Sequence, residues 1–185
     1  MIKIGPGWTL FVDRDGVLNQ RIENDYVKHP DEFLFISGVK EALKDLSGKF
    51  ERIIIVTNQQ GIGRGLMNET QLQQVHQKLK EEIKASGGRI DAVFFSPDLK
   101  NSRSFTRKPS VGMGLMARKM FPSIRFKNSI MVGDTFTDIL FGYRLGMKTV
   151  LIGKDEEIVR QCSEILDYRF DNLFSFAQAV QIVEL

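Results

Sequence analysis

The sequence of 185 residues is poor in cysteine, and this scarcity excludes several classes of protein. Its one cysteine, Cys162, allows neither a disulfide within the chain nor a cysteine-rich metal site. Apolar runs stay well short of the roughly 20 residues that a membrane-spanning helix needs. The first residues also lack the apolar core of a secretory signal peptide. We therefore expect a cytoplasmic protein that does not contact a membrane.

Acidic residues are missing from 99–133, although the whole chain carries 23 of them and a net charge of only +3. This segment holds eight lysines and arginines, a pattern that favours an anionic ligand. We expect the loop that ends at Lys108 to face this ligand. The later basic residues are interpreted as the solvated surface of a helix and the segment after it: Arg118, Lys119, Arg125 and Lys127.

What the chain does contain is a repeated alternation of apolar runs and helical patterns. With 42% apolar and 26% charged residues, it has the composition of one soluble domain over residues 1–185. Strands are predicted at 8–12, 53–56, 90–95, 129–132, 147–152 and 165–170. Helices are predicted after Ser37 with a stop at Gly48, after Asn68, from Pro109, around Asp138, and over 156–164 and 173–180. This order predicts an α/β fold, with a parallel sheet covered by helices on both faces.

Polar side chains follow several of these strands at the point where each strand ends. Asp13 and Asp15 follow the first, Thr57 the second and Asp134 the fourth. Ligands of such sheets bind beyond the carboxyl ends of the strands, and Lys108 lies in a loop that reaches the same edge. The sequence therefore predicts a functional site there.

The residue types at this edge point to phosphoryl chemistry. Three neighbouring carboxylates, Asp13, Asp15 and Asp134, would repel one another without a cation. Mg²⁺ prefers such oxygen ligands together with a substrate phosphate. Lys108 and Thr57 would bind the phosphoryl oxygens. One carboxylate would attack phosphorus while another transfers protons.

Four motifs in this order resemble those of the haloacid dehalogenase (HAD) superfamily of phosphatases. They are D-R-D-G at 13–16, T-N at 57–58, Lys108, and G-D at 133–134 with Asp138. The finer patterns D-R-D-G-x-x-N, T-N-Q-x-G-I-x-R-G and R-K-P resemble the branch of heptose-1,7-bisphosphate 7-phosphatases and histidinol-phosphatases. This resemblance implies a three-layer, Rossmann-like fold. Roughly 40 residues separate the first two motifs and about 50 separate Thr57 from Lys108, and one helix and one strand use most of each interval, so we expect no cap domain.

The resemblance also implies roles for the acidic residues. Asp13 would be the nucleophile that forms an aspartyl-phosphate. Asp15 would protonate the leaving alcohol and then activate water. Asp13, the backbone carbonyl of Asp15, and Asp134 would hold Mg²⁺.

The other motif residues would bind the substrate or support the site. By resemblance, Thr57, Asn58 and Lys108 bind the phosphoryl group, and Arg107 lies near the substrate. Asp138 supports the metal site or Lys108 rather than binding the metal directly.

The chain departs from the branch in the loop at 96–106. Many members carry a zinc loop of three cysteines and a histidine there, whereas this loop has neither residue type. We therefore expect no structural zinc and a different wall formed by Arg103, Phe105 and Arg107. The loop at 20–31 is expected to be the other substrate-contacting element.

The leading hypothesis is a Mg²⁺-dependent phosphomonoesterase for a small phosphorylated metabolite, first of all a sugar bisphosphate. Histidinol phosphate is an alternative substrate. A polynucleotide 3′-phosphatase is another alternative, because the T-N-Q and R-K-P-x-x-G-M stretches fit such enzymes and a basic loop suits nucleic acid. An inactive regulatory module and phosphotransfer to an acceptor other than water remain further alternatives. The sequence leaves the oligomeric state open.

Overall fold

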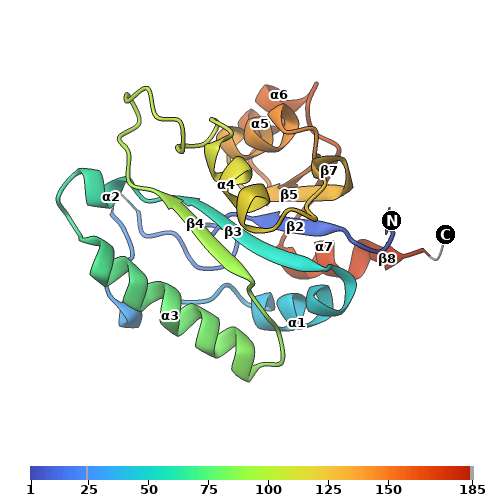
Figure 1. The fold of residues 1–185 in the computed structure, drawn as a ribbon, viewed down its shortest axis with the longest axis horizontal. Helices are drawn as coiled ribbons and strands as arrows, with labels where there is room; N and C mark the ends of the chain where they lie inside the picture. Colours follow the sequence, from blue (N-terminus) through green and yellow to red (C-terminus); the bar gives the residue numbers. More distant parts are fainter. Residues whose placement is uncertain (24, 184–185) are drawn as a thin grey trace.

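A six-stranded parallel sheet forms the centre of the protein in a computed structural model, which describes residues 1–23 and 25–183 (Figure 1). The strand order is β4-β3-β2-β5-β6-β7. The strands are β2 (Thr9–Val12), β3 (Arg52–Asn58), β4 (Ala92–Ser96), β5 (Ser129–Gly133), β6 (Lys148–Ile152) and β7 (Tyr168–Phe170). The central strands are buried on both faces, as their continuous apolar sequences predicted.

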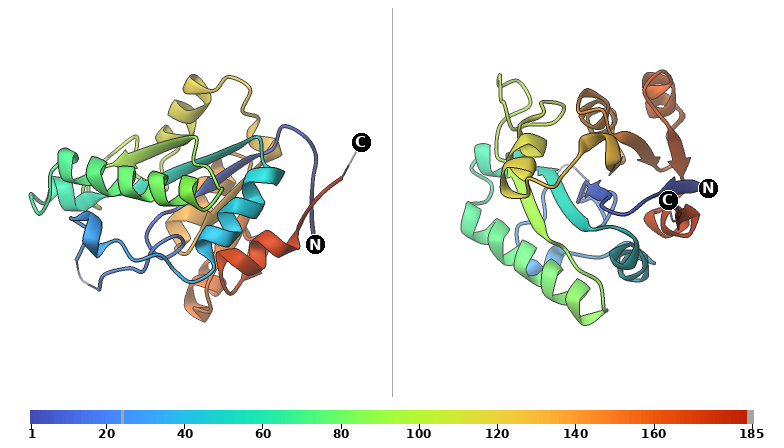
Figure 2. Two further views of the ribbon diagram at one scale, coloured as in Figure 1. Left: turned by 90° about the horizontal axis from the view of Figure 1, so that it is seen from below. Right: turned by 45° about the vertical axis from the view of Figure 1, so that its right-hand side comes forward.

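Helices cover both faces of the sheet, which confirms the predicted α/β class. One face packs against α1 (Val39–Lys49), α3 (Glu69–Ala85) and α7 (Leu173–Ala179). The other face packs against α4 (Gly112–Met120) and α5 (Phe136–Arg144), and α6 (Glu156–Cys162) packs against α5. Figure 2 shows α1 and α7 side by side on their face of the sheet.

The register of β2 explains why distant motifs meet. Val12 is paired with Ile55 on one side and with Val132 on the other, so the residues after these positions reach the same edge. Strand β3 continues through Thr57 and Asn58, two residues further than predicted, because β4 pairs with it there. Backbone pairing with β4 thus holds Thr57 and Asn58 at the edge of the sheet.

Two short strands and one short helix were missed by the sequence analysis. Strand β1 (Ile2–Ile4) pairs with β8 (Val180–Ile182) in a separate parallel sheet that joins the two ends of the chain. Three-residue strands give little periodic signal, and this pairing depends on the rest of the fold. Helix α2 (Gln60–Gly63) is a single turn after β3.

Several helix starts and ends differ from the prediction. Helix α1 is capped by the backbone of Gly38, at φ 80°, rather than by Ser37, and it continues past Gly48 to Lys49. Helix α4 begins at Gly112, because residues 107–110 form a turn, closed by the Ser110 N–H and the Arg107 carbonyl, instead of the first helical turn expected at Pro109. Asn68 does cap α3 as predicted, by accepting a hydrogen bond from the backbone N–H of Gln71.

Long loops rise over the carboxyl edge of the sheet. Among the described residues of 20–36, regular structure is limited to the 3-10 turn Pro30–Glu32 and an isolated bridge at Phe35. The segment at 97–107 is another irregular loop, which projects beside α4 in Figure 1. None of the described helices is long and apolar enough to span a bilayer.

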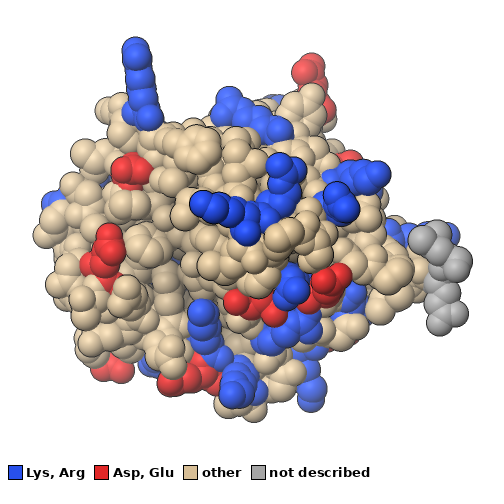
Figure 3. Space-filling view, in the orientation of Figure 1, with Lys and Arg blue, Asp and Glu red and all other residues tan. Residues whose placement is uncertain are grey.

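Basic side chains gather around α4 and the segment after it (Figure 3). The four residues that the sequence analysis placed on a solvated surface, Arg118, Lys119, Arg125 and Lys127, are all exposed. The guanidinium of Arg118 lies over the Phe126 ring, 5.2 Å from its centroid. The exposure of these four side chains agrees with the interpretation of this surface as solvated.

Candidate active site

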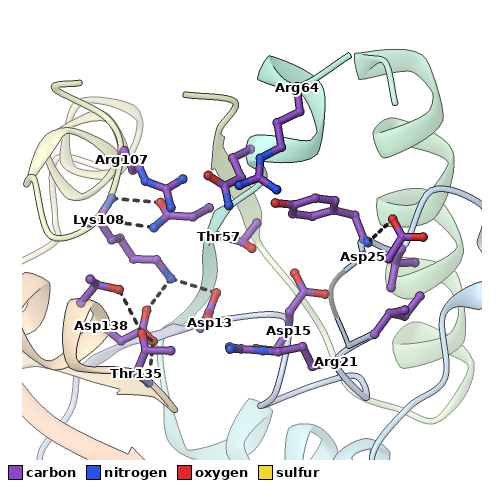
Figure 4. A pocket seen from close by; sticks show the side chains of 16 residues that line it. Asp13, Asp15, Arg21, Asp25, Thr57, Arg64, Arg107, Lys108, Thr135 and Asp138 are labelled. Atoms are coloured by element: carbon purple, nitrogen blue, oxygen red, sulfur yellow. Dashed lines mark hydrogen bonds and ion pairs between the residues drawn. The ribbon is translucent and has the colours of Figure 1, made fainter. Parts of the chain in front are cut away.

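Lys108 joins two of the predicted acids at the centre of the site (Figure 4). Its Nζ lies 2.8 Å from Asp13 Oδ1 and 2.6 Å from Asp138 Oδ1, and it donates a hydrogen bond to the carbonyl of Val56. All three charged residues are buried, with 2%, 7% and 0% exposure for Lys108, Asp13 and Asp138. Burial alone would lower the pKa of Lys108, but the two carboxylates outweigh it and raise this pKa. The lysine therefore stays charged.

The start of α5 fixes the orientation of Asp138. One of its carboxylate oxygens, Oδ2, accepts hydrogen bonds from the backbone N–H and the hydroxyl of Thr135, which completes a capping box. The other oxygen, Oδ1, faces Lys108. Asp138 is thus in direct contact with Lys108, and its role as a support stays a prediction.

The carboxylates of Asp13, Asp134 and Asp138 converge, with one oxygen of each within 4.8 Å of the others. Gly16 leaves room for the Asp134 carboxylate, because a Cβ at this position would lie 2.0 Å from Asp134 Oδ2. Burial and the neighbouring Asp138 raise the pKa of Asp13 to about 6, although Lys108 acts in the opposite direction. Burial and Asp13 likewise raise the pKa of Asp134 well above its usual value.

The side chain of Asp15 turns away from this group, so the cluster expected from Asp13, Asp15 and Asp134 contains Asp138 in its place. The Asp15 carboxylate accepts hydrogen bonds from Arg14, Asn19 and Gln59. Burial would raise the pKa of Asp15, but Arg14 and the hydrogen bonds from Asn19 and Gln59 outweigh it and lower this pKa. Three donors therefore hold Asp15 in one orientation.

A buried histidine supports Arg14 from behind. Arg14 Nη1 lies 3.0 Å from His76 Nε2, while Arg14 Nη2 contacts the Asp15 carboxylate. Burial and the charge of Arg14 lower the pKa of His76 to about 3, so the ring is neutral and accepts from the guanidinium. His76, Arg14 and Asp15 thus form a row of contacting side chains that ends at Asp15.

Thr57 and Asn58 face the same space from the end of β3. Gln59 Nε2 donates to Thr57 Oγ1 at 2.9 Å and to the Asp15 carboxylate at 2.6 Å, which ties these two groups together. Asn58 exchanges two hydrogen bonds with the backbone of Lys108, at 3.0 and 3.2 Å. These bonds fix the loop that delivers Lys108 to the sheet edge.

Arg21 makes contacts that the sequence analysis did not anticipate. Its Nη2 donates to the backbone carbonyl of Asp15 at 3.1 Å and to both oxygens of Asp134, at 3.1 and 2.9 Å. These groups are the ones that the resemblance assigned to Mg²⁺. Arg21 lies in an irregular loop, where no periodic pattern in the sequence reveals its direction.

The edge opens into a cleft of about 400 Å³. Its inner part contains Asp13, Asp15, Thr57 and Lys108. The outer wall carries Tyr26, Arg64 and Arg107, and Figure 4 shows Arg64 and Arg107 on the same side of the cleft. Burial and the neighbouring charge of Arg64 lower the pKa of Arg107.

All eight predicted site residues lie in or beside this cleft. Arg103 and Phe105, predicted as part of the wall, are exposed, and Phe105 has 61% of its surface accessible.

The residues present fit a hard divalent cation. One carboxylate oxygen of Asp13 and one of Asp134 lie within 4.8 Å of each other, and Asp13 Oδ1 is buried with the Lys108 ammonium as its charged partner. The Asp134 carboxylate and the Asp15 carbonyl add oxygen donors at the same edge. Such an all-oxygen set suits Mg²⁺.

Comparison with known proteins places the chain in a family. The polynucleotide kinase 3 phosphatase family matches residues 9–168. A D-glycero-alpha-D-manno-heptose-1,7-bisphosphate 7-phosphatase of Mycobacterium tuberculosis is 32% identical over 96% of this chain and 94% of its own. A D-glycero-beta-D-manno-heptose-1,7-bisphosphate 7-phosphatase of Haemophilus ducreyi is 34% identical over 89% of this chain and 93% of its own.

A solved structure agrees with these sequence relatives. The D,D-heptose 1,7-bisphosphate phosphatase of B. bronchiseptica, complexed with magnesium and phosphate, has a TM-score of 0.83 and 27% identity. The match covers 97% of both chains. The chain is a phosphatase of the HAD superfamily that belongs to the polynucleotide kinase 3 phosphatase family and is related in sequence to the heptose-1,7-bisphosphate 7-phosphatases.

Proposed function

We propose that this protein is a Mg²⁺-dependent phosphomonoesterase that removes the 7-phosphate of a heptose 1,7-bisphosphate. The observation that carries the proposal is the convergence of Asp13, Lys108 and Thr57 at the inner end of a cleft whose outer wall carries Arg64 and Arg107. Relatives that span nearly the whole chain are named for this activity.

In this proposal Asp13 is the nucleophile. Its carboxylate lies at the carboxyl end of β2, beside Lys108, and attacks phosphorus to form an aspartyl-phosphate. Lys108 and the hydroxyl of Thr57 bind the phosphoryl oxygens and stabilise the charge that spreads over them. Mg²⁺, held by Asp13, Asp134 and the carbonyl of Asp15, would supply a Lewis acid that polarises the phosphoryl group.

Asp15 transfers the protons. Arg14, Asn19 and Gln59 hold its carboxylate in one orientation, from which it would reach the leaving oxygen of a bound substrate. A phosphoryl dianion bound beside Asp15 raises its pKa by like-charge repulsion, which prepares the carboxyl group to protonate the leaving alcohol. The carboxylate then takes a proton from the water that hydrolyses the aspartyl-phosphate.

The outer wall of the cleft supports a substrate with a second anionic group. Arg64 and Arg107 both line this wall, and burial, with a smaller contribution from the charge of Arg64, lowers the pKa of Arg107. An anion between two such guanidinium groups relieves their repulsion and receives charge-assisted hydrogen bonds. A bisphosphate would place one phosphate at Asp13 and the other near this pair.

A second candidate is a polynucleotide 3′-phosphatase. The matched family is described by that activity, and Phe105 is an exposed aromatic on the basic loop. Exposed aromatic side chains provide stacking surfaces for unpaired bases. The chemistry at Asp13 would be the same for both substrates.

A phosphate-release panel in the presence of Mg²⁺ separates these functions. It compares kcat/KM for heptose 1,7-bisphosphate, histidinol phosphate, a simple sugar monophosphate and a 3′-phosphorylated oligonucleotide. The proposal expects a preference for the heptose bisphosphate of about a hundredfold or more over the monophosphate, since charge-assisted contacts contribute ~1.5–3 kcal/mol each. A preference for the oligonucleotide that falls steeply with salt would favour the polynucleotide 3′-phosphatase instead.

A further inference from the structure

The loop at 97–107 is closed by an unusual convergence of side chains. Asp98 Oδ2 accepts hydrogen bonds from three hydroxyl groups: those of Ser96, Ser104 and Thr106. Ser96 and Thr106 are also joined, with 3.1 Å between their oxygens. We refer to Ser96, Asp98, Ser104 and Thr106 as the Asp98 clasp.

The Asp98 clasp holds both ends of the same loop. Ser96 is the last residue of β4, whereas Ser104 and Thr106 lie just before the R-K-P motif. A loop without regular structure loses backbone entropy when it is ordered, and local hydrogen bonds must offset that cost. Three hydroxyl donors on one carboxylate oxygen provide this compensation, and they lower the pKa of Asp98. The carboxylate therefore stays ionised and keeps accepting at neutral pH.

Arg107 is connected directly to the clasp at two places. Its backbone N–H donates to Ser104 Oγ at 2.9 Å, and its guanidinium Nη1 donates to the backbone carbonyl of Asp98 at 2.8 Å. The next residue, Lys108, is fixed separately by Asn58. The clasp thus sets the direction of Arg107 without being needed for the placement of Lys108.

We propose that the Asp98 clasp is a positioning device, independent of metal, that aims Arg107 at the distal anionic group of the substrate. Its four side chains hold the loop that corresponds to the zinc loop of many members of the resembling branch. The inference rests on the proposed function, because it assigns the clasp to selection of a bisphosphate by the same cleft. Asp98 acts through Arg107 and does not touch the reacting phosphoryl group.

Kinetics with two substrates test this role. In Asp98→Ala, KM for heptose 1,7-bisphosphate should rise about tenfold or more, since a small misplacement of a substrate-positioning group has effects of this size. The kcat for this substrate and both constants for p-nitrophenyl phosphate, which has no distal phosphate, should stay unchanged. Asp98→Asn retains an acceptor oxygen and should restore part of the lost affinity. Asn101→Ala, an exposed substitution in the same loop, is the matched control.

Hydrogen exchange tests the clasp without any substrate. The amides of Thr106 and Arg107 donate to Ser104 Oγ, so Ser104→Ala should speed their exchange while the β4 amides remain protected. Unchanged exchange would contradict the clasp even if the enzyme prefers the bisphosphate. If exchange is faster but the enzyme does not prefer the bisphosphate, the Asp98 clasp is supported and the proposed substrate is contradicted.

Two further results would overturn the proposal. One is an equal loss of kcat/KM on both substrates in Asp98→Ala, which would make the clasp a general structural element. The other is stoichiometric zinc in the purified protein, with loop exchange that accelerates when a zinc-selective chelator removes it. The proposal expects elemental analysis to find no stoichiometric zinc and the chelator to leave exchange unchanged.

Discussion

The inner and outer parts of the cleft are built on different physical principles. The inner part places Asp13 just after β2 and Asp138 in the first turn of α5, with Lys108 on a loop that Asn58 holds, and each of the three is less than a tenth exposed. The outer part places Arg21, Tyr26 and Arg107 on irregular loops that side-chain hydrogen bonds hold in place. We infer that the inner part performs the chemistry and that the outer part selects the substrate. The loops can then change without disturbing the sheet edge.

The largest effect is expected at the nucleophile. Asp13→Asn keeps the shape of the side chain but removes the attacking carboxylate, so kcat should fall by about 10⁴-fold or more. The matched control is Asp31→Asn in the exposed loop, whose effect should stay below about threefold, as for most surface substitutions. Phosphate release at saturating substrate measures both. Activity of Asp13→Asn within tenfold of the wild type would contradict the division of the cleft.

Removal of the central lysine should affect stability as well as activity. Lys108→Met leaves Asp13 and Asp138 buried without a counterion and should lower the free energy of unfolding by ~3–5 kcal/mol. Lys154→Met breaks the exposed pair with Asp171 and should cost less than ~1 kcal/mol. Urea titrations of both variants measure the difference. Equal losses in the free energy of unfolding for the two variants would show that burial does not determine how much the Lys108 ion pairs contribute to stability.

The support behind Asp15 predicts a dependence of stability on pH. His76 has a pKa of about 3 in the folded protein and about 6.5 when unfolded. The unfolded state therefore binds more protons between these values, and the stabilising contribution is complete above pH 6.5 and lost as the pH falls. Within this window the free energy of unfolding should rise with pH by up to ~1.4 kcal/mol for each pH unit.

Denaturant titrations at several pH values isolate this contribution from that of the acids. His76→Gln retains an acceptor for Arg14 but does not titrate, so its stability should fall less steeply than that of the wild type. His29→Gln, in the exposed loop, should follow the wild-type profile. Parallel profiles for wild type and His76→Gln would show that His76 is not the buried neutral group described here.

The smallest effect is expected where the two parts of the cleft meet. Arg21 donates to Asp134 and to the carbonyl of Asp15, the groups proposed to hold Mg²⁺, so these contacts compete with metal binding. Arg21→Ala should bind Mg²⁺ up to about fivefold more tightly, as expected from a partly exposed ion pair of ~1 kcal/mol. Calorimetric titration with Mg²⁺ tests this directly. Weaker binding would mean that Arg21 assists the metal site instead.

The same division governs what the sequence reveals. Asp13, Thr57 and Asp134 follow apolar strands, and the strand pattern alone predicts that they meet at one edge of the sheet. Asp138 was predicted as a support, and its capping of α5 and contact with Lys108 agree with that prediction. These positions are predictable because regular elements fix the direction of the chain.

Loop contacts gave no comparable signal. Arg21, Gln59 and the Asp98 clasp depend on side chains that meet only after the loops fold onto the sheet edge. The helix expected from Pro109 exists as α4, but it begins three residues later because residues 107–110 form a turn. Short strands such as β1 and β8 pair across nearly the whole chain, where local periodicity carries no information.

The most direct test of the account is a single-turnover measurement of phosphoryl transfer at saturating heptose 1,7-bisphosphate. Rapid acid quench of wild type, Asp98→Ala and Asp13→Asn separates the chemical step from binding. The account predicts the same transfer rate constant for wild type and Asp98→Ala, and no transfer within a wild-type turnover for Asp13→Asn. A slower transfer step in Asp98→Ala at saturation, or normal transfer in Asp13→Asn, would contradict the separation of chemistry from selection.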